Sequence, residues 1–154
     1  MILIAWGLPT IYNYFLIDSF EGLSEILDQD KVINKNEHQH QKGDLKANYE
    51  NVKKTFSDFS NVKILKGWIP DVFNSLNDNI KISFLHIDVD LYQPSLDCLN
   101  NLYDKVVNGG IIITDDYKSS LFPGNKKAWE EFFLKKGINT WVSLPSGQAI
   151  FIKE

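Results

Sequence analysis

The sequence predicts an α/β protein with a doubly wound, mostly parallel sheet that ends in an antiparallel hairpin. Short apolar runs alternate with helical patterns along most of the chain, which is typical of parallel strands joined by crossover helices. Two of these runs, 84–87 and 111–114, are short and apolar, and closely spaced aspartates follow each of them. Two last short runs flank a Pro-Ser-Gly turn, as in a hairpin. The 154 residues suit one domain, so we treat 1–154 as a single unit.

The first half of the chain alternates strand, loop, helix and strand. We expect a buried parallel strand over 14–18, ended by the turn signal of 19–22. The polar segment 24–46 has no clean period and predicts a long loop, of the kind that forms a lid or a disordered segment. Apolar residues at helical spacing predict a helix over 48–59, and alternation predicts a strand over 62–66.

The second half continues the alternation. Pro94 suits the first turn of a helix, and Asn108-Gly-Gly110 suits its end. The expected elements, in order, are a short helix over 71–76, a strand over 82–87, a helix over 94–106, a strand over 111–114, a helix over 125–136, and hairpin strands over 140–144 and 149–152.

Charge and composition exclude several classes of protein. The formal net charge of −4 argues against broad nucleic-acid binding, which needs a basic face. No apolar stretch approaches the length of a membrane span, and the apolar start Met1–Trp6 lacks the other parts of a signal peptide. The single Cys98 excludes an internal disulfide and fits a cytoplasmic protein. We expect Cys98 to be a core residue and not a nucleophile.

Four aspartates follow two of the predicted strands. Asp88 and Asp90 follow the first strand, and Asp115 and Asp116 follow the second. The crevice beyond the carboxyl ends of parallel strands is where such sheets bind ligands. Four carboxylates there would repel one another without a cation, so we expect a divalent metal with oxygen ligands. The alternative is that one or two of them merely cap the next helix.

Four motifs in order resemble the macrocin O-methyltransferase family, whose members are class I S-adenosylmethionine-dependent enzymes with a Rossmann-like fold. The motifs are Asp18-Ser-Phe-Glu-Gly-Leu23, Lys66-Gly-Trp-Ile-Pro70, His86-Ile-Asp-Val-Asp-Leu-Tyr92 and Gly109-Gly-Ile-Ile-Ile-Thr-Asp-Asp-Tyr117. The resemblance runs from about Tyr14 to the C-terminus. It implies methyl transfer from S-adenosylmethionine, assisted by Mg²⁺, to a sugar hydroxyl of a saccharide or glycosylated natural product.

The resemblance also implies roles at the cofactor. Asp18 matches the acid that binds the ribose hydroxyls, and Ser19 and Phe20 would flank the adenosine. Gly67 and Trp68 fall where such enzymes hold the adenine ring, and an indole face suits a purine. The alternative for Trp68 is an ordinary core aromatic.

At the reacting end, the resemblance implies that Asp88 is the general base. Relatives close a lid over the substrate where this chain has its polar loop with His38 and His40; the alternative for both histidines is a solvated loop. The implied Mg²⁺ ligands are Asp90, Asp115 and Asp116.

The chain departs from the family before Asp18. Family members begin with a strand, a glycine-rich turn and a helix, whereas here only Met1–Asn13 precede the strand, with Gly7 as the one glycine. We therefore expect the first strand and the glycine-rich turn to be missing, and interpret Met1–Trp6 as the tail of the lost helix. The two strands beside the gap would then close up, be bridged by the Met1 segment, or recruit another chain as a homo-oligomer.

Two functions of different classes follow. The first is the enzyme just described, acting on a small sugar or glycoside. The second is a catalytically impaired remnant of that fold that serves as a binding or interaction module. A phosphoryl-transfer protein that uses paired aspartates and Mg²⁺ is less well supported, because no lysine and Ser or Thr stand at further strand ends.

Overall fold

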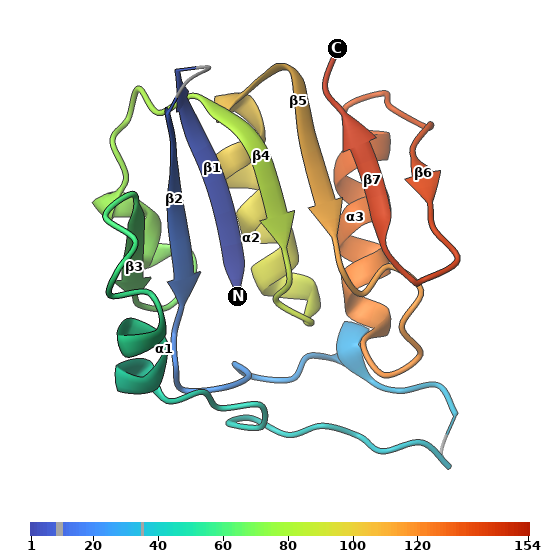
Figure 1. The fold of residues 1–154 in the computed structure, drawn as a ribbon. Coiled ribbons are helices and arrows are strands. Elements are labelled where there is room, and N and C mark those ends of the chain that lie inside the picture. The colour runs from blue at the N-terminus through green and yellow to red at the C-terminus, as the bar shows by residue number, and fades with distance from the viewer. Residues whose placement is uncertain (9–10, 35) are drawn as a thin grey trace.

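The computed structural model describes residues 1–8, 11–34 and 36–154 and shows a seven-stranded sheet in the order β3-β2-β1-β4-β5-β7-β6 (Figure 1). The α/β prediction is confirmed. The sheet is mixed and not mostly parallel, because four of the six strand pairings among the described residues are antiparallel. The strands are β1 (Ile2–Leu8), β2 (Ile11–Asp18), β3 (Val62–Lys66), β4 (Ile82–Ile87), β5 (Val106–Thr114), β6 (Val142–Ser143) and β7 (Ala149–Ile152).

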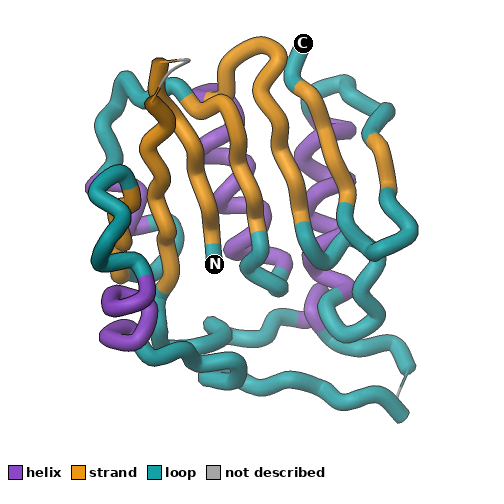
Figure 2. The backbone as a smooth tube through the Cα atoms, viewed as in Figure 1, coloured by secondary structure: helices purple, strands orange, loops and turns teal. Residues whose placement is uncertain are grey.

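The helices form one layer behind the sheet and a smaller group beside β3. Helices α2 and α3 pack together on one face, and no described helix lies over the near face of β1, β4 and β5 (Figure 2). The three α-helices are α1 (Tyr49–Thr55), α2 (Tyr92–Leu102) and α3 (Pro123–Lys135), and the short 3₁₀ helices are η1 (Asp28–Asp30), η2 (Asp71–Ser75) and η3 (Tyr103–Lys105).

The Met1 segment is a strand, so its interpretation as the tail of a lost helix is wrong. Strand β1 lies between β2 and β4 and is antiparallel to both, with Ile2 opposite Ile17 and Ile87. Only two residues separate β1 from β2 in the sequence. A connection that short can join antiparallel strands, whereas parallel neighbours need a crossover of a dozen or more residues. Strand β1 therefore fills the gap expected between β2 and β4. The unpaired strand edges that were the reason to expect self-association are not present there.

The core lies between the sheet and the layer of α2 and α3. Ile2 and Ile4 of β1 are fully buried and join this core, which explains why the N-terminal strand pairs as it does. Trp129 and Phe133 of α3 are its largest fully buried side chains. Cys98 is also fully buried, and burial strongly raises the pKa of its thiol, which confirms it as a core residue.

Most element boundaries agree with the sequence predictions, and one interpretation fails. Asn108-Gly-Gly110 does not close a helix but lies inside β5, because α2 ends at Leu102 and η3 leads directly into the strand. Gly109 has a φ of +78°, and a Cβ on Gly110 would lie 2.6 Å from a methyl carbon of Val106. The two glycines thus allow an irregular stretch of β5, at which its register with β4 shifts.

The other predicted elements are present with small shifts. The helix expected over 48–59 is α1, which is shorter and is capped by the Asn48 side chain accepting from the Asn51 amide. The segment 24–46 is a loop as expected, with η1 as its only regular element among the described residues; residue 35 lies outside them. The C-terminal hairpin of β6 and β7 is confirmed. No described helix has the length and apolar character needed to cross a bilayer.

Candidate active site

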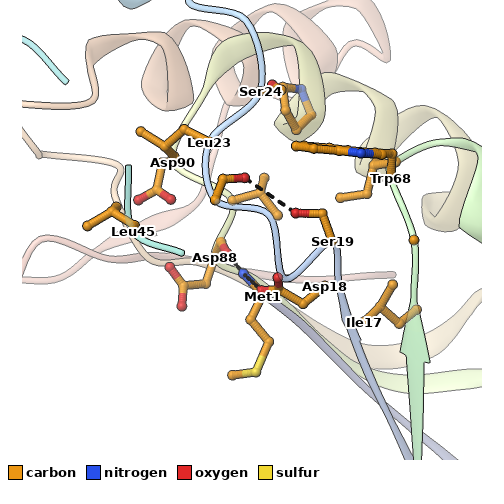
Figure 3. Close-up of a pocket in the computed structure, with 15 residues that line it drawn as sticks. Met1, Ile17, Asp18, Ser19, Leu23, Ser24, Leu45, Trp68, Asp88 and Asp90 are labelled. Atoms are coloured by element: carbon orange, nitrogen blue, oxygen red, sulfur yellow. Dashed lines mark hydrogen bonds and ion pairs between the residues drawn. The ribbon is translucent and has the colours of Figure 1, made fainter. Parts of the chain in front are cut away.

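A pocket of about 320 Å³ opens at the carboxyl ends of β2, β3 and β4 (Figure 3). Asp18 ends β2, and Asp88 and Asp90 follow β4. Because β1 runs in the opposite direction, its preceding residue Met1 reaches the same edge of the sheet. Leu45 from the long loop also lines the pocket. The pocket therefore lies at the strand ends where an α/β sheet binds its ligands.

Three carboxylates converge beside this pocket. Asp88, Asp90 and Asp116 each offer an oxygen, and these oxygens lie within 4.8 Å of one another. We call them the carboxylate cluster. Asp90 has a φ of +63°, a left-handed conformation that costs a residue with a side chain free energy and is held by its surroundings. The parallel pairing of β4 with β5 brings the two aspartate-bearing ends together.

The carboxylate cluster is electrostatically costly without a cation. Burial, and then the negative charges of Asp90, Asp88 and Asp115, raise the pKa of Asp116 to about 7. Burial, followed by the charge of Asp88, also raises the pKa of Asp90. Asp116 Oδ2 is buried and has no hydrogen-bond partner. Several carboxylate oxygens with an unmatched buried acceptor are the donor set that a hard divalent cation takes.

Asp115 is oriented differently from the other three aspartates. Its Oδ1 accepts a hydrogen bond of 3.0 Å from Gln148 Nε2 and lies 3.4 Å from His86 Nε2. Gln148 comes from the turn of the C-terminal hairpin, so Asp115 connects β5 to that hairpin and to β4. It is not part of the group of oxygens within 4.8 Å, and its assignment as a metal ligand stays a prediction. Nothing in the sequence singles out Gln148.

A buried polar network holds the strand ends in place. Thr114 Oγ1 donates to Asn125 Oδ1 at 2.8 Å, and Asn125 Nδ2 donates to Ser95 Oγ at 3.2 Å. Ser95 Oγ in turn donates to the Leu91 carbonyl at 2.7 Å. The network joins the end of β5 to the starts of α2 and α3, and so fixes the segments that carry the four aspartates. Polar residues inside otherwise apolar helix faces are the one sequence signal for it.

The other end of the pocket is built around Asp18. Its Oδ1 accepts a 2.6 Å hydrogen bond from the Phe20 amide, and its Oδ2 lies 3.5 Å from the amino group of Met1. That amino group also donates to the Asp88 carbonyl (Figure 3). The Gly67 amide donates to the Asp18 carbonyl at 3.0 Å, which joins the ends of β2 and β3. The Phe20 amide therefore fixes Oδ1 of Asp18, while Oδ2 faces the Met1 amino group at the pocket.

The residues predicted to contact adenosine differ in their exposure. Ser19, Gly67 and Trp68 line the pocket, and Trp68 is 43% exposed, so it is not a core aromatic. Phe20 is 4% exposed and packs edge-on against Tyr49, outside the pocket lining. Its amide contacts Asp18, so the structure places its backbone, and not its ring, at the site.

A buried aspartate that the sequence analysis missed anchors the long loop. Asp30 is 1% exposed, and its two oxygens accept from the Tyr92 amide at 2.7 Å and the Leu27 amide at 3.1 Å. The Asp30 carboxylate packs against Gly124 and needs a glycine there, because a Cβ on residue 124 would lie 1.9 Å from Asp30 Oδ1. Tyr92 begins α2, two residues after Asp90, so the anchor connects the loop to the carboxylate cluster.

The fold and the site together define a methyltransferase-like α/β protein with an acid at the end of β2 and a carboxylate cluster after β4 and β5. Comparison with known families agrees: the profile of the macrocin-O-methyltransferase (TylF) family matches residues 5–153. The chain belongs to the macrocin O-methyltransferase family, a family of O-methyltransferases.

Two similar proteins are named as O-methyltransferases. Demethyldecarbamoylnovobiocin O-methyltransferase of Streptomyces niveus is 29% identical over 79% of this chain and 47% of its own length. Mycinamicin III 3''-O-methyltransferase of Micromonospora griseorubida is 29% identical over 81% of this chain and 50% of its own. The chain thus spans about half the length of the curated relatives that it matches.

Solved structures show the same fold. The O-methyltransferase NovP superposes with a TM-score of 0.73 at 27% identity, over 90% of this chain and 59% of that one. The calicheamicin methyltransferase CalS11 gives a TM-score of 0.71 over the same shares of the two chains, and at 19% identity it supports the fold alone.

Proposed function

We propose that this protein acts in methyl transfer from S-adenosylmethionine, assisted by Mg²⁺, to a sugar hydroxyl of a saccharide or glycosylated natural product, in the cytoplasm. The observation that carries the proposal is the buried, unpartnered oxygen of Asp116 within a carboxylate cluster beside a pocket. Membership of an O-methyltransferase family and the names of its relatives support the type of reaction and the class of acceptor.

The pocket residues suit the methyl donor. Asp18 Oδ2 would accept hydrogen bonds from ribose hydroxyls in place of its contact with the Met1 amino group. Trp68, half exposed beside Ser19 and Gly67, offers an aromatic face to adenine. S-adenosylmethionine, when bound, supplies an electrophilic methyl group. Phe20 would support Asp18 through its amide.

The carboxylate cluster suits the acceptor end. Asp90 and Asp116 would hold Mg²⁺, with Asp115 as the third predicted ligand or as a support for the others through Gln148. Mg²⁺, when bound, supplies Lewis acidity that lowers the pKa of a hydroxyl. Asp88, beside both the cluster and the pocket, would accept the hydroxyl proton. The loop that carries Leu45 would exclude water from this space.

The alternative of a catalytically impaired remnant is less well supported. A module kept only for interactions has no need of three partly buried carboxylates whose burial and mutual repulsion raise the pKa of Asp116. The paired strand ends and the buried network of Thr114, Asn125 and Ser95 keep this costly arrangement in place. Such features are expected of a site that binds a cation.

The test is isothermal titration with S-adenosylmethionine, with and without Mg²⁺, followed by a methyl-transfer assay on a glycoside. We expect binding that is lost in Asp18→Asn and unchanged in the exposed Asp28→Asn control. If this chain does not bind S-adenosylmethionine, with or without Mg²⁺, the proposed function is refuted.

A further inference from the structure

The long loop holds a second group of ligand atoms, separate from the carboxylate cluster. His38, His40 and Asp44 each offer a ring nitrogen or carboxylate oxygen, and these atoms lie within 4.8 Å of one another. His40 Nδ1 lies 3.3 Å from Asp44 Oδ2, and the rings of His38 and His40 meet edge to face at 4.9 Å. We call these three residues the histidine cluster.

The donor set of the histidine cluster differs in kind from that of the carboxylate cluster. Two imidazoles and one carboxylate are the ligands that Zn²⁺ takes in sites with three protein ligands and one open position. Mg²⁺ and Ca²⁺ prefer oxygen ligands throughout, as Asp88, Asp90 and Asp116 provide. The chemistry of the side chains therefore assigns different metals to the two groups.

Two ligands of the histidine cluster are held in place without a metal. The His40 ring stacks on Phe122, with centroids 4.9 Å apart and planes at 16°. Phe122 is buried at the start of α3, in a small apolar cluster with Leu23 and Leu91, so the ring rests on this cluster. Asp44 Oδ2 accepts from the Gln41 amide at 2.9 Å, and the Asp44 carbonyl accepts from the Leu23 amide at 2.8 Å. Little reorganisation is needed before binding.

The charges nearby do not oppose a cation. Lys42 pairs with Glu25, and Lys31 pairs with Asp28, so the two lysines that line the shallow hollow beside His40 already have anionic partners. His38 is exposed, which leaves a path from solvent to the histidine cluster. A cation there would be matched by the single carboxylate of Asp44.

We propose that His38, His40 and Asp44 form a Zn²⁺ site in the long loop. The ion would join two points of the loop to each other and, through the stacked His40 ring, to Phe122. Leu23, paired with Asp44, and Leu45, next to it, both line the pocket. Zinc would thus stiffen the loop where it borders the pocket. The site does not depend on the proposed function.

The test is calorimetric titration of the whole chain with ZnCl₂ in excess MgCl₂, added as a competitor for the carboxylate cluster. We expect one Zn²⁺ per chain, and a loss of affinity of about tenfold or more in His38→Gln and in His40→Gln. His86→Gln, which changes the remaining histidine, should leave Zn²⁺ affinity unchanged. Co²⁺ in place of Zn²⁺ should give visible absorption bands that His38→Gln removes.

Three results would overturn the proposal. They are no Zn²⁺ binding by the whole chain, equal affinity in His38→Gln and the unchanged chain, and loss of binding in Asp116→Asn but not in His38→Gln. The last would place zinc at the carboxylate cluster. Because His38 is exposed, its substitution should leave the thermal unfolding temperature unchanged, which separates lost ligation from lost folding.

Discussion

The carboxylate cluster and the histidine cluster gather ligand atoms within the same 4.8 Å, but the fold holds them by different means. Asp88, Asp90 and Asp116 stand at the ends of paired parallel strands above a buried polar network. His38, His40 and Asp44 stand on a loop that is held by the buried Asp30, one stacked ring and a few backbone hydrogen bonds. The comparison teaches that a frame of strands can keep repelling charges together, whereas a loop can gather only side chains that attract or tolerate one another.

The largest expected effect is that of Asp116→Asn on Mg²⁺. The change removes an anionic oxygen from the carboxylate cluster, so Mg²⁺ binding and methyl transfer should both be abolished. Zn²⁺ affinity at the histidine cluster should not change, which would show that the two groups are independent. Calorimetric titration with each ion measures both. Transfer that survives this change and added EDTA would rule out a metal-assisted mechanism.

Asp88→Asn should separate proton transfer from metal binding within the carboxylate cluster. If Asp88 is the base, turnover should fall about 10²–10⁴-fold while Mg²⁺ affinity falls less than in Asp116→Asn. Steady-state transfer rates at saturating Mg²⁺, with calorimetry in parallel, provide the measurement. Equal losses of Mg²⁺ affinity in the two variants would make Asp88 a ligand instead.

Asp30 connects the long loop to the start of α2, and its removal should lower the free energy of unfolding. Asp30→Ala leaves the buried Tyr92 amide and the part-buried Leu27 amide without this acceptor, so we expect a loss of about 1–3 kcal/mol in unfolding free energy. The matched control is Asp28→Ala in the same 3₁₀ helix, whose exposed carboxylate should contribute little to stability. Urea unfolding measures both, and equal effects would contradict the anchor.

The smallest effect concerns pH in the metal-free protein. The pKa of Asp116 is about 7 in the folded state and near 3.8 in the unfolded state. Between about pH 4 and pH 7, therefore, the folded state holds a proton that the unfolded state has lost. Stability should therefore fall as pH rises from about 4 to 7, by about 1–2 kcal/mol once partial exposure is allowed for. Asp116→Asn should flatten this slope. A slope unchanged by the substitution would place its origin elsewhere.

The sequence predicted the aspartates of the carboxylate cluster because they directly follow two apolar runs that are recognisable as strands. The apolar runs before Asp88 and Asp115 predicted two parallel strands, and parallel strands bring their carboxyl ends to one edge of the sheet. The same reasoning did not distinguish Asp115 from the three aspartates of the carboxylate cluster, because the orientation of its side chain depends on contacts with Gln148 and His86. It also did not find Asp30, since an aspartate in a polar loop looks solvated until its burial is known.

The sequence by itself determined the α/β class, the strand-ending aspartates and the family, because these depend on local periodicity and on motifs. Only the tertiary structure decided the direction of β1, the burial of Asp30 and the meeting of His40 with Phe122. The pairing of β1 with β4, the hydrogen bond of Asp30 with the Tyr92 amide and the stacking of His40 on Phe122 all join segments far apart in the chain. An apolar start such as Met1–Trp6 suits a helix tail or a strand equally well, and the unpaired backbone groups of β2 and β4 decide between them.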